Sequence, residues 1–325
     1  MKKLGVFIAV LFLIVSSCKE EGKKANYKPV SIGAINSLTL VIDNELWKGS
    51  VGDKIREHFA APVLGLAWEE PLFTINQLQA NVFTGAIRHT RSLLYVQKDS
   101  LNIAHIKSDL YAKPQKVSVI KGRTDEEIIA NIDEKADEII KAFKGLEVVE
   151  AQKRFLRSTN KEKALEENLG ITLSMPSVYK VGRKEKNFVW LDRQIPKGNM
   201  NIIAYSMPSN SFKSDSTFVK DIIAIRDSIG QQYIPGSDEG SYMITEKAFA
   251  PYVFPTKIGG KKGVEVKGIW EMNGYPMAGP FLSYIINDEK NNRKLIIEGF
   301  VFAPSTEKRD YMFELEAILK TIEFK

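Results

Sequence analysis

The strongest constraint on the fold is an alternating run near the C-terminus. Between Val264 and Met272, apolar residues and one glycine at even positions alternate with mainly charged residues at odd positions. Since successive side chains of a strand point to opposite faces, this period of two predicts a strand with one buried face. Asn273 and Gly274 follow directly, and this pair is typical of a tight hairpin turn because both residues tolerate positive φ. The region therefore predicts antiparallel strands.

Other segments of the C-terminal half extend this pattern. Residues 281–286 and 295–302 are expected to complete a three-stranded meander. Asp215 is predicted to cap a helix whose apolar face includes Phe218 and Ile222, and Pro304 precedes a last amphipathic helix. Strands segregated from helices are typical of an antiparallel sheet with helices packed on it.

The N-terminal half has a similar order of elements. Strands are expected over 37–43, 72–82, 92–97, 101–107 and 116–120. Thr124 and Glu127 form a capping box at the start of the clearest helix, and Gly145 is expected to end it. A second, charged helix is expected over 150–168, between the halves.

These patterns predict an α+β protein of two domains, each a mainly antiparallel sheet packed with helices. The expected divisions are a signal peptide over 1–17, a tether over 18–30, an N-terminal domain over 31–150 and a C-terminal domain over 151–325.

Cys18 is the only cysteine, and it follows Lys2, Lys3 and an apolar stretch over 5–15. Such a stretch is typical of a signal peptide and is too short for a membrane-spanning helix, which needs about 20 residues. The segment Val15-Ser16-Ser17-Cys18 is similar to a lipobox. It predicts cleavage before Cys18 and a membrane anchor of acyl chains, palmitate among them. A plain signal peptide with an unrelated cysteine is the alternative.

The residues after Cys18 bear on location. Lys19, Glu20 and Glu21 resemble the export signal of Bacteroidota surface lipoproteins. The resemblance implies display on the outer face of the outer membrane, with the periplasmic face as the alternative. Residues 19–30 are polar and predict a flexible tether.

Composition limits the remaining classes of function. Cleavage leaves 308 of 325 residues, and loss of Lys2 and Lys3 lowers the formal charge from +6 to +4. The charges are interspersed, so binding to nucleic acid is not predicted. The sequence contains no P-loop, GxGxxG or GxSxG motif, and its three histidines, His58, His89 and His105, lack zinc-site spacing. No cofactor or metal site is predicted, and Gly259 to Gly263 is interpreted as a hairpin turn.

A candidate binding segment begins at the end of the alternating run. The predicted binding residues are Trp270, Glu271, Tyr275, Met277 and Phe281. Aromatic side chains beside glycines are suited to stack on a sugar or grip a peptide. The alternative is core packing, because Trp270 shares a strand face with Val264 and Val266.

Carboxylates near this segment indicate a second possible function, the hydrolysis of glycans. Glycoside hydrolysis needs two carboxylates about 5–9.5 Å apart, and Asp238, Glu239 and Glu271 are the candidates. Their alternative role is as solvated groups or ion-pair partners. Two further charged motifs, Arg226-Asp227 and Lys308-Arg309-Asp310, are interpreted as internal ion pairs on helices.

Short motifs along nearly the whole mature chain carry a family resemblance. They are Trp47-Lys48-Gly49-Ser50-Val51-Gly52-Asp53, Glu70-Pro71-Leu72-Phe73, Asn187-Phe188-Val189-Trp190-Leu191, Arg226-Asp227-Ser228-Ile229, Tyr233-Ile234-Pro235-Gly236, Gly268-Ile269-Trp270-Glu271-Met272, Met277-Ala278-Gly279-Pro280-Phe281, Glu298-Gly299-Phe300-Val301 and Lys308-Arg309-Asp310. Together they resemble the domain of unknown function 4837 family of Bacteroidota lipoproteins. Ala278 departs from the glycine expected there.

The resemblance implies a lipoprotein but transfers no catalytic residue, because the family has no established activity. The C-terminal half is also similar to the photosystem-accessory and Mog1-type α/β/α sandwich, a likeness of fold alone.

We therefore expect a non-enzymatic, outer-membrane-anchored lipoprotein that serves as a binding or assembly component of the cell envelope, with an envelope protein or glycan as partner. The alternative is a glycan- or peptide-acting hydrolase that uses carboxylates near Trp270.

Overall fold

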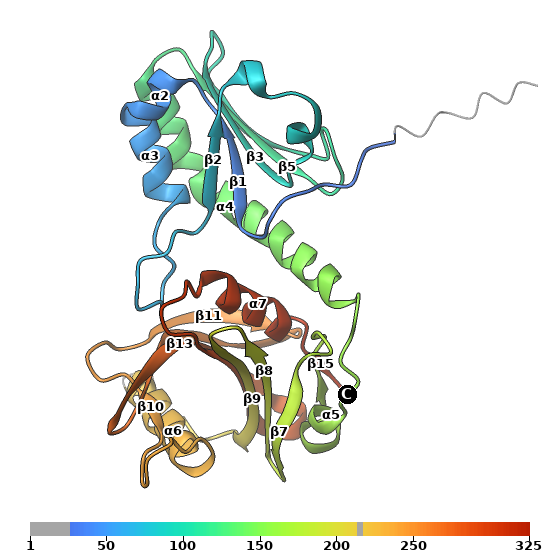
Figure 1. Cartoon of the computed structure of the whole chain (residues 1–325), viewed down its shortest axis with the longest axis vertical. Helices are drawn as coiled ribbons and strands as arrows, with labels where there is room; N and C mark the ends of the chain where they lie inside the picture. The colour runs from blue at the N-terminus through green and yellow to red at the C-terminus, as the bar shows by residue number, and fades with distance from the viewer. Residues whose placement is uncertain (1–26, 213–216) are drawn as a thin grey trace, which may run out of the picture.

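A computed structural model describes residues 27–212 and 217–325. The predicted lipidation site Cys18, the predicted export residues Lys19, Glu20 and Glu21, and the predicted cap Asp215 lie outside the described residues. In the described part of the chain, no helix has the length and apolar character needed to cross a membrane. The chain forms an N-terminal half (residues 27–155) and a C-terminal half (residues 156–325), each built on its own sheet (Figure 1).

The N-terminal sheet has five strands in the order β2-β1-β3-β5-β4. Their bounds are β1 (Ser37–Val41), β2 (Thr74–Leu78), β3 (Ser92–Lys98), β4 (Ile103–Ser108) and β5 (Lys116–Gly122). Only β4 is antiparallel to its neighbour, and the other three pairings are parallel. The expectation of a mainly antiparallel sheet in this half is wrong. Helices α2 (Asn44–Lys48) and α3 (Ser50–Phe59) return the chain between β1 and β2, as parallel pairing requires.

Three helices cover one face of this sheet. Helices α2, α3 and α4 (Asp125–Phe155) pack their apolar sides on Leu38, Leu40 and Ile120. The opposite face carries a smaller cluster around Phe83 and Leu93, beside the short helices η1 (Ala80–Val82) and η2 (Gly85–His89).

Helix α4 joins the two halves (Figure 1). Thr124 caps it, since the backbone N–H of Glu127 donates to its hydroxyl at 3.3 Å. The predicted end at Gly145 is wrong, because the helix continues to Phe155, which packs into the C-terminal core. Burial of this last apolar turn outweighs the low helix propensity of glycine. The prediction of a single helix over 150–168 is also wrong, because this region contains the end of α4 and the separate short helix α5 (Ala164–Leu169).

The C-terminal sheet has eight antiparallel strands in the order β10-β12-β13-β14-β9-β8-β7, with β11 paired to β12. Their bounds are β7 (Lys180–Glu185), β8 (Phe188–Ile195), β9 (Gly198–Pro208), β10 (Met243–Thr245), β11 (Tyr252–Ile258), β12 (Lys261–Met272), β13 (Tyr275–Asp288) and β14 (Arg293–Phe302). A separate two-stranded ribbon joins β6 (Ile171–Thr172) to β15 (Glu323–Phe324), and η3 (Glu289–Asn291) precedes β14.

Both predicted hairpin turns of this sheet are confirmed. Gly274 has a φ of 78° in the turn between β12 and β13. Gly259 and Gly260, with φ of 55° and 76°, form the turn between β11 and β12. The glycines therefore serve chain reversal, for which their freedom to adopt positive φ suits them.

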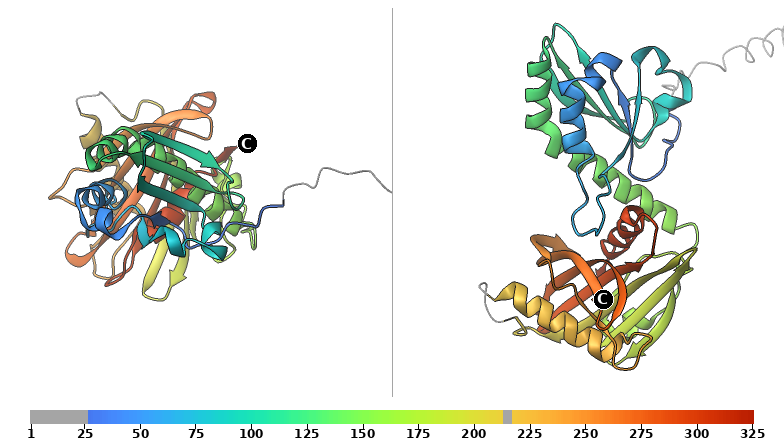
Figure 2. Two further views of the ribbon diagram at one scale, coloured as in Figure 1. Left: turned by 90° about the horizontal axis from the view of Figure 1, so that it is seen from above. Right: turned by 60° about the vertical axis from the view of Figure 1, so that its left-hand side comes forward.

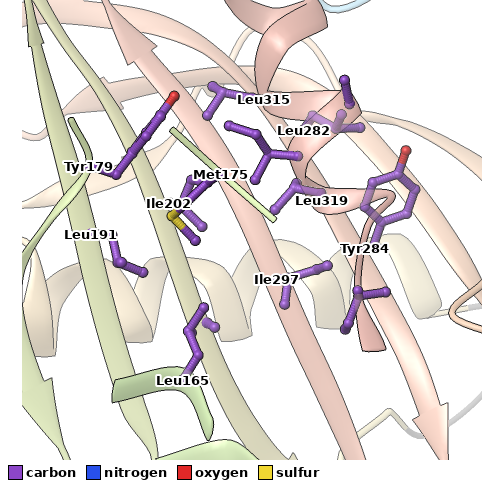
Figure 3. Close-up of a cluster of buried hydrophobic side chains, with 14 of the residues drawn as sticks. Leu165, Met175, Tyr179, Leu191, Ile202, Leu282, Tyr284, Ile297, Leu315 and Leu319 are labelled. Carbon is purple, nitrogen blue, oxygen red and sulfur yellow. The ribbon is translucent and has the colours of Figure 1, made fainter. Parts of the chain in front are cut away.

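Helices cover both faces of the C-terminal sheet. Helix α6 (Phe218–Tyr233) packs on the face that contains Trp270, whereas α5 and α7 (Arg309–Leu319) pack on the other. Figure 3 shows this second core, in which Leu315 and Leu319 of α7 lie over Leu282 and Ile297 of the sheet. The α+β class and the α/β/α arrangement of this half are confirmed.

Candidate functional site

A pocket of about 250 Å³ lies on the α6 side of the C-terminal sheet. We call it the aromatic pocket. Six strands of the sheet, namely β8, β9, β10, β12, β13 and β14, and the loop after α6 supply its lining, which consists of Trp190, Asn199, Asn201, Ile234, Pro235, Gly236, Ser237, Met243, Trp270, Met272, Tyr275, Met277, Phe300 and Phe302.

Trp270 forms the floor of the aromatic pocket. Its side chain is 2% exposed, and its indole N–H donates to the carbonyl of Val301 at 3.3 Å. The ring of Phe300 meets it edge to face, with centroids 5.9 Å apart. A side chain at Gly279 would place its Cβ 2.9 Å from the indole nitrogen. The glycine on β13 therefore makes room for this tryptophan on β12.

Trp190 forms one wall and connects the rings to polar groups. Its indole N–H donates to the side-chain oxygen of Asn201 at 3.1 Å, and the Asn201 amide donates to the side-chain oxygen of Asn199 at 2.7 Å. Asn199 is half-buried at the pocket edge. This chain of hydrogen bonds fixes the orientation of a neutral amide beside the aromatic rings.

The mouth of the aromatic pocket is formed by residues with greater exposure. Tyr275, just after the β12–β13 turn, is 40% exposed, and Met277 is half-buried. Ser237 is exposed on the opposite side, in the loop after α6. An aromatic ring and a hydroxyl are thus accessible from solvent.

The structure brings together three of the five predicted binding residues: Trp270, Tyr275 and Met277. Glu271 lies between Trp270 and Met272 on β12 and therefore points to the other face of the sheet. Phe281 is 1% exposed and lies under the guanidinium of Arg226 at 3.9 Å, outside the lining of the aromatic pocket.

The sequence interpretation missed the contributions of β8, β9 and β14. Trp190, Asn199 and Phe302 come from these strands and line the aromatic pocket. The strand order places β14, β9 and β8 beyond β13. No local pattern identified this neighbourhood, although Trp190 stood in one of the family motifs.

The three candidate carboxylates do not enter the aromatic pocket. Asp238 and Glu239 are exposed in the loop after α6, and Glu271 faces away. Among the described residues, those lining this pocket include no Asp, Glu, His, Lys or Arg. The described residues also contain no group of three or more His, Cys, Asp or Glu side chains placed to hold a metal ion.

An internal ion pair is confirmed for Arg226, although its partner is Glu298 of β14 and not the neighbouring Asp227, whereas Arg309 pairs with Asp310, whose side chain is 56% exposed. Arg226 binds Glu298 at 2.8 Å with both side chains buried, and Arg309 binds Asp310 at 2.9 Å. Burial raises the pKa of Glu298, although the Arg226 charge opposes this shift. Among the histidines, His58 is half-buried and lies 2.7 Å from Asp133.

Sequence comparison identifies the family. The family described as Domain of unknown function (DUF4837) matches residues 158–321. The chain belongs to the DUF4837 family. Residues 31–156 match a second family, described as Domain of unknown function (DUF8532). The DUF4837 match contains the aromatic pocket, whereas no curated protein matches the chain.

Solved structures similar to this DUF4837 chain include the Saccharomyces cerevisiae Ran-binding protein Mog1p, with 10% identity, a TM-score of 0.32 and coverage of 48% of this chain and 90% of that one. A Mog1 point mutant has 9% identity, a TM-score of 0.29 and the same coverage. A Pseudomonas aeruginosa protein of unknown function, PA94, a putative regulator, has 11% identity, a TM-score of 0.23 and coverage of 42% and 84%. Structural similarities as weak as these do not indicate what this chain does.

Proposed function

We propose that this DUF4837 protein is a lipid-anchored outer-membrane protein that acts as a non-enzymatic binding component of the cell envelope. The lipobox-like segment ending at Cys18 supports the anchor, and Lys19, Glu20 and Glu21 support display at the cell surface. Two or three acyl chains on Cys18 would hold the protein stably at the membrane, since one chain alone gives only marginal binding.

One observation carries the binding part of the proposal. The aromatic pocket combines exposed and half-buried rings with an oriented neutral amide and a hydroxyl, and its described lining contains no charged side chain. Rings of this kind stack on apolar faces, while amides and hydroxyls exchange hydrogen bonds with hydroxyl groups. The chemistry fits an uncharged sugar unit of an envelope glycan. No observation favours the hydrolase alternative at this pocket, because none of the three candidate carboxylates lines it.

The anchor is tested by replacing the lipidated thiol. Cells expressing the wild type or Cys18→Ser would be labelled with a clickable palmitate analogue and separated into membrane and soluble fractions. We expect label and membrane association for the wild type, and neither for Cys18→Ser in a chain that is still processed. Equal membrane association of both chains, each without its signal peptide, would contradict the anchor.

Surface display is tested separately with a membrane-impermeant amine reagent on intact cells. We expect labelling of the wild type, and its loss when Lys19, Glu20 and Glu21 are all replaced by alanine. Labelling of the wild type only after lysis would place the protein on the periplasmic face.

A further inference from the structure

A second cavity, of about 660 Å³, lies between the two halves. The loop from α3 to β2 extends toward the C-terminal half (Figure 2). Residues of this loop line the cavity together with residues of α4, α7, β12 and β13. We call it the interface cavity. Its volume falls within the range of about 300–1,000 Å³ that is typical of small-molecule sites.

The walls of the interface cavity are mainly apolar. Leu64 and Leu66 come from the loop, Val148 from α4, and Met312 and Phe313 from α7. Leu64 is 47% exposed, although it is a large aliphatic residue in contact with the cavity. A hydrocarbon chain placed here would remove this surface from water, which is favourable in proportion to the area covered.

Cationic side chains outnumber acidic ones among the described residues that line the cavity. The described residues that line the cavity include five cationic side chains and one acidic side chain, namely Lys141, Lys144, Lys267, Arg309, Lys320 and Glu316. Three of the cations already have carboxylate partners in Glu265, Asp310 and Glu316. Burial opposes ionisation of Glu316, but the nearby lysines lower its pKa, so it remains an anion.

Lys144 is the cation best placed for a ligand. Its ammonium donates to the side-chain oxygen of Asn36 at 2.7 Å and to the carbonyl of Leu72 at 2.6 Å. Both acceptors are neutral, and an ammonium has three donors, so one donor is left for a further acceptor. The ammonium also lies 4.5 Å from the ring centre of Phe73 and 5.2 Å from that of Phe313. Burial lowers the pKa of Lys144 to about 8, although the carboxylates of Glu316, Glu147 and Asp310 oppose this shift. A bound anion would offset the cost of keeping this charge out of water.

The space next to Lys144 is open. Its neighbour Gly145 also lines the cavity, and a Cβ added there would meet no heavy atom within 4 Å. Lys141, one helical turn earlier, is exposed and lines the same cavity. Two lysines of α4 therefore flank an open volume bounded by apolar walls.

We propose that the interface cavity binds a single-chain amphiphile with an anionic headgroup. The alkyl chain lies against the apolar residues of the loop and α7, and the headgroup accepts hydrogen bonds from Lys144 and Lys141. The shared chemistry is a carboxylate or phosphate on one acyl or alkyl chain. This site is distinct from the aromatic pocket, so failure of either proposal leaves the other standing.

The test is isothermal titration of the chain from residue 19 with decanoate and decyl phosphate, each below its micellar concentration, and with decanol below its solubility limit. We expect one site for at least one of the two anions, with decanol at least tenfold weaker because it cannot pair with an ammonium. The comparison of decanoate with decyl phosphate distinguishes a carboxylate from a phosphate headgroup. No saturable binding by either anion, or equal binding of decanol, would overturn the proposal.

Two variants locate the binding site. Lys144→Gln should raise the dissociation constant by about tenfold or more, as expected for loss of a hydrogen bond to a charged group. Lys153→Gln is the matched control, since Lys153 is exposed on the same helix and lies outside the cavity lining. Gly145→Trp should fill the cavity and abolish binding, whereas Gly145→Ala should preserve it. Binding that survives both Lys144→Gln and Gly145→Trp would place the amphiphile elsewhere and overturn the proposal.

Discussion

The side-chain carboxylate of Glu70 accepts a hydrogen bond from the backbone N–H of Arg309 at 2.7 Å. The backbone N–H of Lys308 donates to the same carboxylate at 2.8 and 2.9 Å. Arg309 is the first residue of α7, and Lys308 is its N-cap residue, whose own side chain makes no capping hydrogen bond. A residue of the N-terminal half, 5% exposed, thus caps a helix of the C-terminal half.

Glu70→Ala should therefore lower the free energy of unfolding by about 1–3 kcal/mol, because two buried amides lose their acceptor. Glu69→Ala, at the exposed preceding residue, is the matched control and should change it by less than about 0.5 kcal/mol. Urea unfolding followed by circular dichroism measures both. Equal effects of the two substitutions would show that the Glu70 cap adds nothing.

The loss of stability on breaking the buried Arg226–Glu298 pair should depend on whether one or both side chains are replaced. Arg226→Met leaves the Glu298 carboxylate buried without its cation and should cost about 3–5 kcal/mol of unfolding free energy. Replacing both residues by methionine should cost less, because no charge is then stranded. The exposed pair of Lys184 and Glu167 provides the comparison, and Lys184→Met should cost less than about 1 kcal/mol. A double replacement at least as damaging as Arg226→Met would contradict this view of the pair.

Lys144 should make stability depend on pH. Burial lowers its pKa from 10.5 to about 8, so between these values the unfolded chain binds more protons than the folded chain. The unfolding free energy contributed by this residue therefore rises as pH increases through that window. We expect the difference in stability between the wild type and Lys144→Met to shift toward the wild type by about 2 kcal/mol from pH 7.5 to pH 10. Denaturant titrations at both pH values measure this, and a difference that does not change with pH would refute the lowered pKa.

Substitutions at Trp270 and Tyr275 should differ in their effects on the stability of the fold and on glycan binding. Trp270 is 2% exposed, so Trp270→Ala should cost about 3–5 kcal/mol of unfolding free energy and deform the aromatic pocket. Tyr275 is 40% exposed at the mouth, so Tyr275→Ala should change stability by less than about 1 kcal/mol while weakening glycan binding. Unfolding curves and a glycan array for both variants check this. Undiminished glycan binding by folded Tyr275→Ala would remove that residue from the site.

The parts of the fold that local patterns control could be predicted from the sequence. The alternation before Met272 and the Asn273-Gly274 pair identified β12 and its turn, because strand period and turn geometry are local properties. The direction of strand pairing in the N-terminal half was missed, since it depends on contacts between distant segments. The extension of α4 past Gly145 was missed for the same reason. It depends on Phe155 packing into the other half.

The candidate site could likewise be predicted only in part from the sequence. Trp270, Tyr275 and Met277 were identified because they are close in sequence around one turn. Trp190 and Phe302 join them only through the order of strands in the sheet. Residues of several family motifs make contacts that stabilise the fold, among them the Glu70 cap and the Arg226–Glu298 pair.

The most direct test of a surface-displayed binding protein is photocrosslinking from the aromatic pocket on intact cells. A benzophenone amino acid would replace Tyr275 in the full chain, and Tyr252, 47% exposed on β11 and outside the pocket lining, would carry it in the control. We predict a crosslink from position 275 to an envelope glycan or glycoprotein, which free competing glycan prevents, and none from position 252. The same products from both positions, or a crosslink at 275 that no glycan prevents, would contradict the proposed binding function.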